Sequence, residues 1–162
     1  MARYLEKERI LKQLENDRKN AEIAGNPIIN FFRNEYEFLS NMYESPIQYG
    51  GFTYRNAEAA FQAQKTIVHD ALFENMIGIA AKKHGRKVAL RPDWEKIKLD
   101  VMYKVVYEKF NQDKNLKAML IKTGNTELIE GNFWGDTFWG ICDGVGENNL
   151  GKILMRVRKE LS

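Results

Sequence analysis

The sequence predicts a mostly helical α+β fold, because helical patterning covers most of the chain and one clear hairpin signal interrupts it. Residues 47–49 and 52–54 are short β-prone runs joined by Gly50-Gly51, a pattern typical of a hairpin with a primed turn. Residues 91–110 carry apolar side chains over a broad side, so we expect them to form the central helix of a small bundle. The length of 162 residues suits a single domain with its own core.

The chain divides into a charged N-terminal segment and a longer main domain. Residues 2–24 predict a charged helix with a thin apolar stripe that stops at Gly25, so we expect a helical extension over 1–27 and the main domain over 28–162. The other predicted elements are a buried strand over 28–32, helices over 56–65, 70–84 and 115–122, a short strand over 127–130 and a last helix over 150–161. On that last helix, Arg158 is expected to be surface charge.

The composition, 44% hydrophobic and 29% charged, is that of a soluble globular protein. The net charge of +3 permits a phosphate-bearing partner but does not require one. The single cysteine, Cys142, excludes an internal disulfide and favours a reducing compartment, and no apolar run approaches the ~20 residues of a membrane span. We therefore expect a cytoplasmic protein. Zinc is not expected, because His69 and His84 have no cysteine near them.

Residues 56–65 predict a capped helix with one polar stripe. Asn56 is a good N-cap, and Glu58, Gln62 and Lys65 follow at i, i+4 and i+7. If neighbouring elements surround this helix, an acid, an amide and an amine face one cavity from a rigid scaffold. The alternative is an ordinary solvated helix face with an i, i+4 pair.

Basic residues gather at the end of the helix predicted over 70–84. Two interpretations stay open: the cations could simply favour the C-terminal end of the helix dipole, or they could clamp a phosphate. The residues are Lys82, Lys83, Arg86, Lys87 and Arg91.

An aromatic, glycine-rich stretch over 132–140 repeats Phe-Trp-Gly around Asp136. The aromatic side chains would exclude water, which is how proteins tune a carboxylate for chemistry, whereas the alternative is a turn-forming acid at the edge of the core. Trp94 leaves a similar choice at the start of the central helix. It fills the core there, or it stacks on a planar base.

Taken in order, these stretches resemble the NADAR family, also called YbiA-like. Each motif is short, but the ordered set is specific and spans about residues 28–161. The matching pieces are Ile29-Asn30-Phe31-Phe32, Leu39-Ser40-Asn41, residues 54–58, Phe61-Gln62-Ala63-Gln64-Lys65, Asp93-Trp94, Lys109-Phe110, Thr123-Gly124, Glu130, Asp136, Trp139-Gly140, Asn148 with Leu150-Gly151, and Leu154-Met155 with Val157-Arg158. The chain departs from the family after Glu58, where Ala59 and Ala60 replace a His-aromatic pair, and this difference bears on substrate choice.

The resemblance implies a mostly helical α+β fold and an N-glycosidase that needs no metal or cofactor. It implies two substrate classes: ribosylamino-pyrimidine phosphates of early riboflavin synthesis, and ADP-ribose attached to guanine in nucleic acid. Glu58, Trp94 and Asp136 match the family's proposed active-site positions. Lys65 matches a lysine that would form a covalent intermediate with the sugar.

The chemistry of these residue types agrees with the implied activity. Breaking a C–N glycosidic bond builds positive charge on the sugar carbon, which carboxylates stabilise while they pass protons. A lysine with a lowered pKa can form a Schiff base with the opened sugar. Amides would hold sugar hydroxyls, and arginine or lysine would bind phosphate. The expected substrate-binding residues are Arg33, Asn41, Gln62, Lys83, Arg86, Arg91, Trp139, Gly140 and Asn148.

Two other functions remain open from the sequence. A non-catalytic module that binds ADP-ribose or nucleotides would show affinity without turnover, although binding alone does not need Glu58, Lys65 and Asp136 together. A helical interaction protein built on residues 2–24 would lose function, but not its fold, when that segment is deleted.

Overall fold

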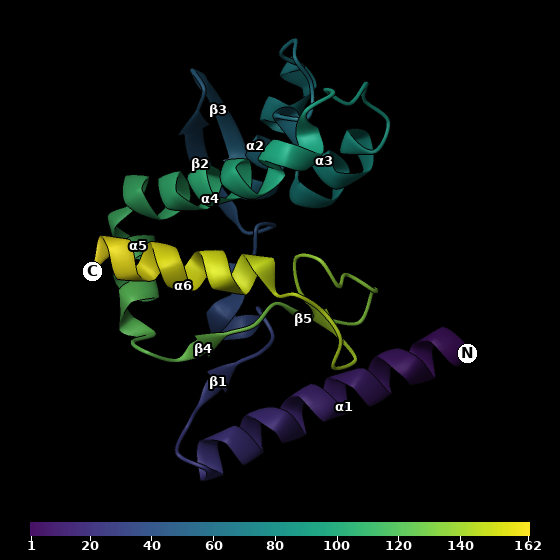
Figure 1. Ribbon diagram of the computed structural model, residues 1–162, viewed down its shortest axis with the longest axis vertical. Coiled ribbons are helices and arrows are strands. Elements are labelled where there is room, and N and C mark those ends of the chain that lie inside the picture. The colour runs from purple at the N-terminus through teal and green to yellow at the C-terminus, as the bar shows by residue number, and fades with distance from the viewer.

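Helices make up most of the fold, which also contains three short two-stranded sheets. The computed structural model describes residues 1–162, and Figure 1 shows their arrangement. The α-helices are α1 (Ala2–Ile23), α2 (Ala57–Ala63), α3 (Gly78–Gly85), α4 (Trp94–Gln112), α5 (Lys114–Lys122) and α6 (Asn149–Leu161). The strands are β1 (Ile28–Ile29), β2 (Glu44–Tyr49), β3 (Phe52–Asn56), β4 (Glu127–Leu128), β5 (Gly131–Asn132) and β6 (Ile141–Cys142), and the 3-10 helices are η1 (Asn34–Leu39) and η2 (Ala71–Asn75). The predicted mostly helical α+β fold is confirmed.

Helices α4 and α6 lie side by side in the middle of the molecule and build its core (Figure 1). Val105 and Phe110 of α4 and Leu154 of α6 are fully buried between them and their neighbours. Helices α2 and α3 and the β2–β3 hairpin lie on one side of this pair, while β1, β4 and α1 lie on the other. The central helix predicted over 91–110 is therefore confirmed, with its first helical residue at Trp94.

The predicted hairpin and the predicted helix cap are both present. Strands β2 and β3 pair antiparallel, and Gly50 (φ 61°) and Gly51 (φ 88°) both take the left-handed backbone that a primed turn requires. Strand β3 runs directly into α2 through Asn56, whose Oδ1 accepts a hydrogen bond from the Ala59 N–H at 2.8 Å. The hairpin thus fixes where α2 begins, and with it the direction of the helix that carries Glu58.

The single helix predicted over 70–84 is wrong, because the chain breaks into η2 and α3. Met76, between the two, has an extended backbone, and its carbonyl accepts a hydrogen bond from Asn56 Nδ2 at 3.0 Å. This bond to the start of α2 competes with helical pairing at Met76. Leu72 and Ile77, which a single helix would place on its apolar face, are 61% and 49% exposed.

Arg158 was predicted at the surface, and this is also wrong. Its side chain is buried, and Nη1 donates hydrogen bonds of 2.8 Å to Thr123 Oγ1 and to the carbonyl of Thr126. The helical period alone does not show that the turn after α5 folds back over this arginine.

The strands predicted over 28–32 and 127–130 pair with each other, but each is shorter than expected. Strands β1 and β4 run parallel over two residues, with Ile29 opposite Leu128. Beyond Ile29, the Asn30 side chain leaves the ladder and donates to the Leu14 carbonyl at 2.8 Å. The loop that follows β1 can then turn toward the cavity described below.

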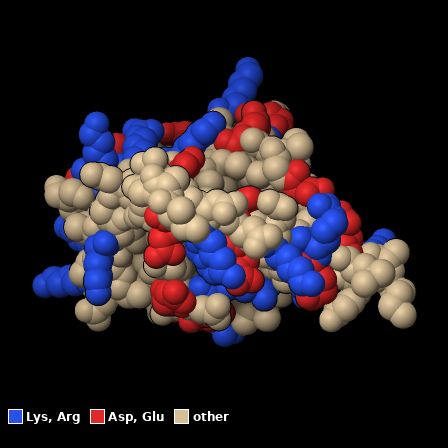
Figure 2. Space-filling model, turned by 90° about the horizontal axis from the view of Figure 1, so that it is seen from below, with Lys and Arg blue, Asp and Glu red and all other residues tan.

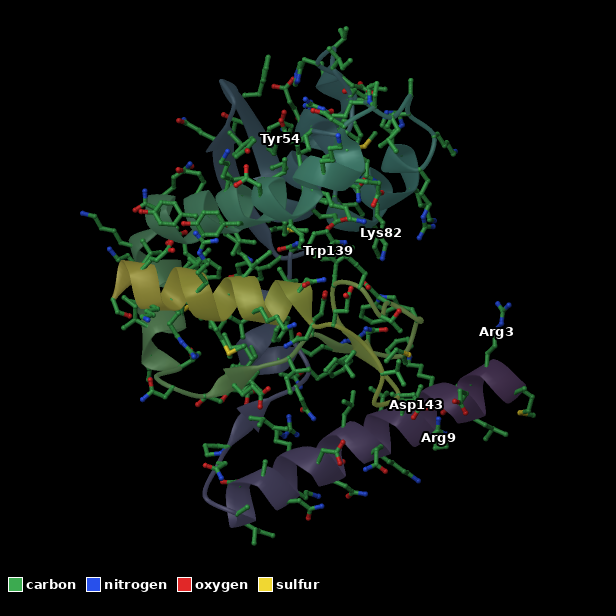
Figure 3. The ribbon with its side chains drawn as sticks, in the orientation of Figure 1. Arg3, Arg9, Tyr54, Lys82, Trp139 and Asp143 are labelled. Atoms are coloured by element: carbon green, nitrogen blue, oxygen red, sulfur yellow. The ribbon has the colours of Figure 1, made fainter.

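Helix α1 lies along the edge of the molecule and contacts it through few side chains. Ile10 is its one buried residue, and Arg9 Nη2 lies 2.5 Å from Asp143 Oδ2 (Figure 3). Figure 2 views the molecule from the side on which α1 lies, and basic and acidic side chains are interspersed over that face. None of the helices, α1 included, combines the length and apolar character that crossing a bilayer requires.

Candidate active site

One cavity of about 1010 Å³ lies between the α2–α3–α4 side of the molecule and the loops around β1 and β5. All four residues expected to be catalytic line it: Glu58, Lys65, Trp94 and Asp136. Six of the expected substrate-binding residues also line it, namely Arg33, Asn41, Gln62, Lys83, Arg86 and Trp139.

The polar stripe of α2 forms part of the cavity wall rather than a solvated face. Glu58 and Gln62 are 8% and 5% exposed, and Gln62 Nε2 donates to Glu58 Oε1 at 2.8 Å. The Glu58 N–H donates to the Asn41 carbonyl at 3.0 Å, which anchors the first turn of the helix. Burial raises the pKa of Glu58, and this rise is opposed by the bond from Gln62 and by the charges of Lys82 and Lys65.

Lys65 lies just beyond the last residue of α2, at the edge of the cavity. Its N–H donates to the Gln62 carbonyl at 3.1 Å and its carbonyl accepts from the Arg91 N–H at 2.8 Å, so its backbone is held on both sides. Its ammonium forms no ion pair and lies 6.0 Å from the centre of the Trp94 ring. Burial lowers the pKa of Lys65, and the charge of Glu58 opposes this. A larger fraction of this amine is therefore neutral than for a solvated lysine.

Aromatic side chains make the floor between these polar groups. The Phe61 ring lies 5.1 Å from that of Trp94 and 5.4 Å from that of Trp139, measured between ring centres. Trp94 is 4% exposed and packs in the core, and it also lines the cavity, so its stacking on a planar base stays a prediction. Such a wall suits a planar base.

Asp136 is both a turn-forming acid and a cavity residue. Its Oδ1 accepts hydrogen bonds from the N–H groups of Phe138 (3.2 Å) and Trp139 (2.9 Å). The buried Asn132 fixes the same loop, because it accepts from the Asp136 N–H and donates to the Asp136 carbonyl. Oδ2 makes no hydrogen bond within the protein, which leaves it free for a ligand.

Cations reach the cavity from two walls. Lys82, Lys83 and Arg86 come from α3 and the residue after it, and none of them forms an ion pair. Arg33 comes from the loop after β1 and lies over the Phe31 ring, 5.0 Å from its centre. In Figure 3, Lys82 and Trp139 mark the α3 wall and the loop wall. This distribution favours the phosphate interpretation of the basic cluster over that of a solvated helix end.

Three expected binding residues do not line the cavity. The Arg91 guanidinium is paired with Asp93, with Nε 2.6 Å from Oδ1, so its charge is already neutralised. Asn148 uses its side chain internally, accepting from the Glu130 N–H at 2.9 Å and donating to the Leu128 carbonyl at 3.0 Å. Gly140 lies so close to the chain that a Cβ there would come within 2.1 Å of the Glu130 carbonyl oxygen. These three predictions are corrected: Asn148 and Gly140 support the backbone of Glu130 instead.

The expected catalytic and substrate-binding residues did not include Glu130, Lys82 or Lys98, all of which line the cavity. Burial, with added repulsion from Asp136 and Glu58, raises the pKa of Glu130 to about 8. The family motifs include Glu130, but an acid in the short link between β4 and β5 has no local signal that it faces a cavity. The basic cluster in the sequence already contained Lys82. Which of its members line the cavity follows only from the way α3 is turned in the structure.

No group of three or more His, Cys, Asp or Glu side chains comes together as a metal site would require. The cavity offers carboxyls, amides and the cationic side chains of lysine and arginine. These groups can stabilise positive charge on a sugar, pass protons and hold a phosphorylated ligand.

Comparisons with known proteins agree with this geometry. The model of the NADAR domain matches residues 30–162. The N-glycosidase YbiA of Escherichia coli is 35% identical over 145 residues, covering 83% of this chain and 89% of that protein. A riboflavin biosynthesis protein of Vibrio vulnificus is 38% identical over 133 residues, or 76% of this chain and 35% of that longer protein.

The solution structure of E. coli YbiA superposes with a TM-score of 0.75 at 34% sequence identity, covering 83% of this chain and 84% of that one. The fold, the family model and the curated relatives thus agree over nearly the same residues. The chain belongs to the NADAR family, and it is an N-glycosidase.

Proposed function

We propose that the cavity cleaves the C–N glycosidic bond of a phosphorylated ribosyl substrate, with ADP-ribose linked to guanine in nucleic acid as the first candidate. The observation that carries this proposal is the meeting of Glu58, Lys65 and Asp136 in one cavity. The α3-side cations Lys82, Lys83 and Arg86 line the same cavity and have no ion-pair partners. An acid–amine–acid set serves bond cleavage, whereas a module that only binds nucleotides needs none of it.

Glu58 and Asp136 supply the negative charge that the reaction requires. As the bond to the base breaks, positive charge develops on C1 of the sugar, and a nearby carboxylate stabilises it. Asp136 is fixed by two backbone N–H groups and keeps Oδ2 free, while Glu58 is oriented by Gln62. Both carboxyls are thus held in place before substrate binds.

Lys65 is the proposed nucleophile. Its neutral amine adds to C1 of the sugar as the electron pair of the C–N bond goes to the departing base. The C1–O4 bond of the sugar ring then breaks, and O4 takes its electron pair and a proton from the Lys65 nitrogen, which gives the imine of the opened sugar. Water hydrolyses this imine, which returns the free amine and releases the sugar. Burial of Lys65 supports this role because it lowers the pKa of the amine.

The size of the cavity and the placing of its cations support the ADP-ribosyl candidate. A volume of about 1010 Å³ lies at the upper end of the range for ligand pockets, and cations come from both α3 and the loop bearing Arg33. A diphosphate between two nucleosides can meet both. The second candidate is a ribosylamino-pyrimidine phosphate, supported by the riboflavin biosynthesis relative.

The test is a mass-spectrometric assay of purified protein on DNA carrying ADP-ribosylated guanine and, separately, on a ribosylamino-pyrimidine phosphate. Wild type is compared with Glu58→Gln and with Glu22→Gln, which makes the same change on the exposed face of α1. We expect loss of the modification with wild type and Glu22→Gln only. Binding without turnover on either substrate would instead establish the non-catalytic module.

A further inference from the structure

We propose that Glu130 is the general acid of the reaction, delivering the proton that the departing base needs as the C–N bond breaks. This inference rests on the proposed N-glycosidase function and assigns a role to a cavity residue beyond the four discussed above.

Glu130 is half-buried, and its carboxyl forms no hydrogen bond with the protein. It lines the same cavity as Glu58 and Asp136, and its Oε2 is inaccessible to water and makes no hydrogen bond with the protein. A carboxyl kept for structure alone is normally hydrogen-bonded, because an unsatisfied buried polar group costs ~1–3 kcal/mol. No internal hydrogen bond therefore accounts for this carboxyl, and the residue lines the cavity in which a substrate would bind.

The backbone of Glu130, in contrast, is fixed on both sides. Its N–H donates to Asn148 Oδ1 at 2.9 Å, and its carbonyl accepts from the Ile141 N–H at 2.9 Å. Gly140 has no Cβ, which lets the chain approach that carbonyl closely. A rigid backbone below a side chain with an unused oxygen is the arrangement expected for a positioned acid.

The groups that face Glu130 keep its proton in place at neutral pH. Asp136 from the 131–140 loop and Glu58 from α2 repel a negative charge there, and only Lys82 from α3 attracts one. Together with burial, they raise the pKa to about 8, while the Asp136 carboxylate is held by N–H donors. Carboxyls in one site with such different surroundings divide the acid and base roles between them.

The proposed step is balanced in protons and electrons. The C–N electron pair passes to the nitrogen of the base, the proton of Glu130 joins that nitrogen, and the sugar carbon becomes bonded to Lys65. The bond from that carbon to the ring oxygen O4 then breaks, O4 takes its electron pair and one proton from the Lys65 nitrogen, and a protonated imine of the opened sugar forms. Water then adds to the imine carbon, the Lys65 amine leaves, and the second proton of the water returns to Glu130 through the cavity. The sum is hydrolysis of one N-glycosidic bond.

The test separates leaving groups that need a proton from one that does not. Glu130→Gln keeps the size of the side chain but cannot act as an acid. Wild type, Glu130→Gln and the surface control Glu22→Gln are assayed on the N-ribosyl substrate that wild type cleaves and on the 4-nitrophenyl glycoside of ribose 5-phosphate. Nitrophenolate departs without protonation.

For Glu130→Gln we expect kcat to fall about 10²- to 10⁴-fold on the N-ribosyl substrate and to stay unchanged on the nitrophenyl glycoside. Wild-type activity on the N-ribosyl substrate should fall as pH rises past about 8, the pKa of Glu130. Glu130→Ala, which leaves space, should regain activity on added formate.

Equal losses on both substrates, or no loss on either, would overturn the acid role while leaving the N-glycosidase function intact. Failure of formate to rescue Glu130→Ala, in a protein that melts like wild type, would count against it too. A wild type that cleaves neither N-ribosyl substrate would instead overturn the proposed function, and the role of Glu130 with it.

Discussion

The two walls of the cavity hold acids in opposite ways. On the α2 wall, Glu58 has a side-chain partner, Gln62, four residues further along the same helix. On the loop wall, Glu130 has a fixed backbone but a carboxyl oxygen with no partner. Helix α2 gives its carboxyl a hydrogen-bonding partner, whereas the loop that carries Glu130 leaves one carboxyl oxygen without any. Acids of one residue type can therefore serve different steps of a reaction when their surroundings differ.

The largest effect should come from removing the oriented charge. Glu58→Gln should lower kcat about 10²- to 10⁴-fold, because the amide can still bond to Gln62 but carries no charge to stabilise the sugar cation. Single-turnover rates measure this. Asp136→Asn should act alike without loosening its loop, since Oδ1 still accepts from Phe138 and Trp139. Activity near wild type in both variants would show that neither Glu58 nor Asp136 takes part in the reaction.

Glu130 should lower the free energy of unfolding at pH values at which its carboxyl is ionised. The pKa of Glu130 in the folded protein is about 8, above its unfolded value, so its favourable contribution is complete below the unfolded pKa. That contribution is lost as pH rises through about 8. Glu130→Gln should therefore be more stable than wild type at pH 9, by an amount on the order of a few kcal/mol, and similar to it at pH 4.

Urea unfolding of both proteins at the two pH values measures the stability difference. Glu22→Gln, on the exposed face of α1, serves as the control and should show no such pH-dependent gain. An equal difference between wild type and Glu130→Gln at both pH values would mean that Glu130 titrates normally.

Arg86, which has no ion-pair partner, should contribute more to substrate binding than Arg91, which is paired with Asp93. Arg86→Gln should raise KM roughly 10- to 100-fold, since a hydrogen bond to a charged group contributes about 1.5–3 kcal/mol. Arg91→Gln should leave KM unchanged, because that guanidinium is paired with Asp93 outside the cavity. Steady-state kinetics on one substrate compares KM of the two variants. Equal changes in KM would contradict the proposal that a phosphate binds beside Arg86.

The smallest effect is expected far from both walls. The Arg9–Asp143 pair joins α1 to the loop after β6, but both side chains are about half exposed. Arg9→Gln should therefore change neither kcat nor KM, and should shift the melting temperature only slightly. A marked loss of activity in this variant would favour the interpretation of α1 as the functional element.

The helix wall could be predicted from sequence because its information is local. Asn56 caps α2, and the spacing of Glu58 and Gln62 puts both on one face. The loop wall could not, because the burial of Glu130 depends on Asn148, which lies 18 residues further along the chain. The amide side chain of Asn148 and its place in the family motifs made it look like a ligand residue.

The same distinction explains the errors in the fold. The helix predicted over 70–84 had good local patterning, but a hydrogen bond from Asn56 takes the carbonyl at Met76. Arg158 had the period of a surface position, but the turn at Thr123 and Thr126 covers it. Tertiary contacts between distant segments overrode the local pattern in both places.

Glu58 and Glu130 are proposed to act on the same bond of one substrate. A double-mutant cycle with Glu58→Gln, Glu130→Gln and the double variant, measured as single-turnover rates on the N-ribosyl substrate, tests it most directly. The account predicts strong non-additivity, with the double variant hardly slower than the slower single one, because the groups serve the same transition state. Losses that simply multiply would show that Glu58 and Glu130 act independently, and would contradict the claim.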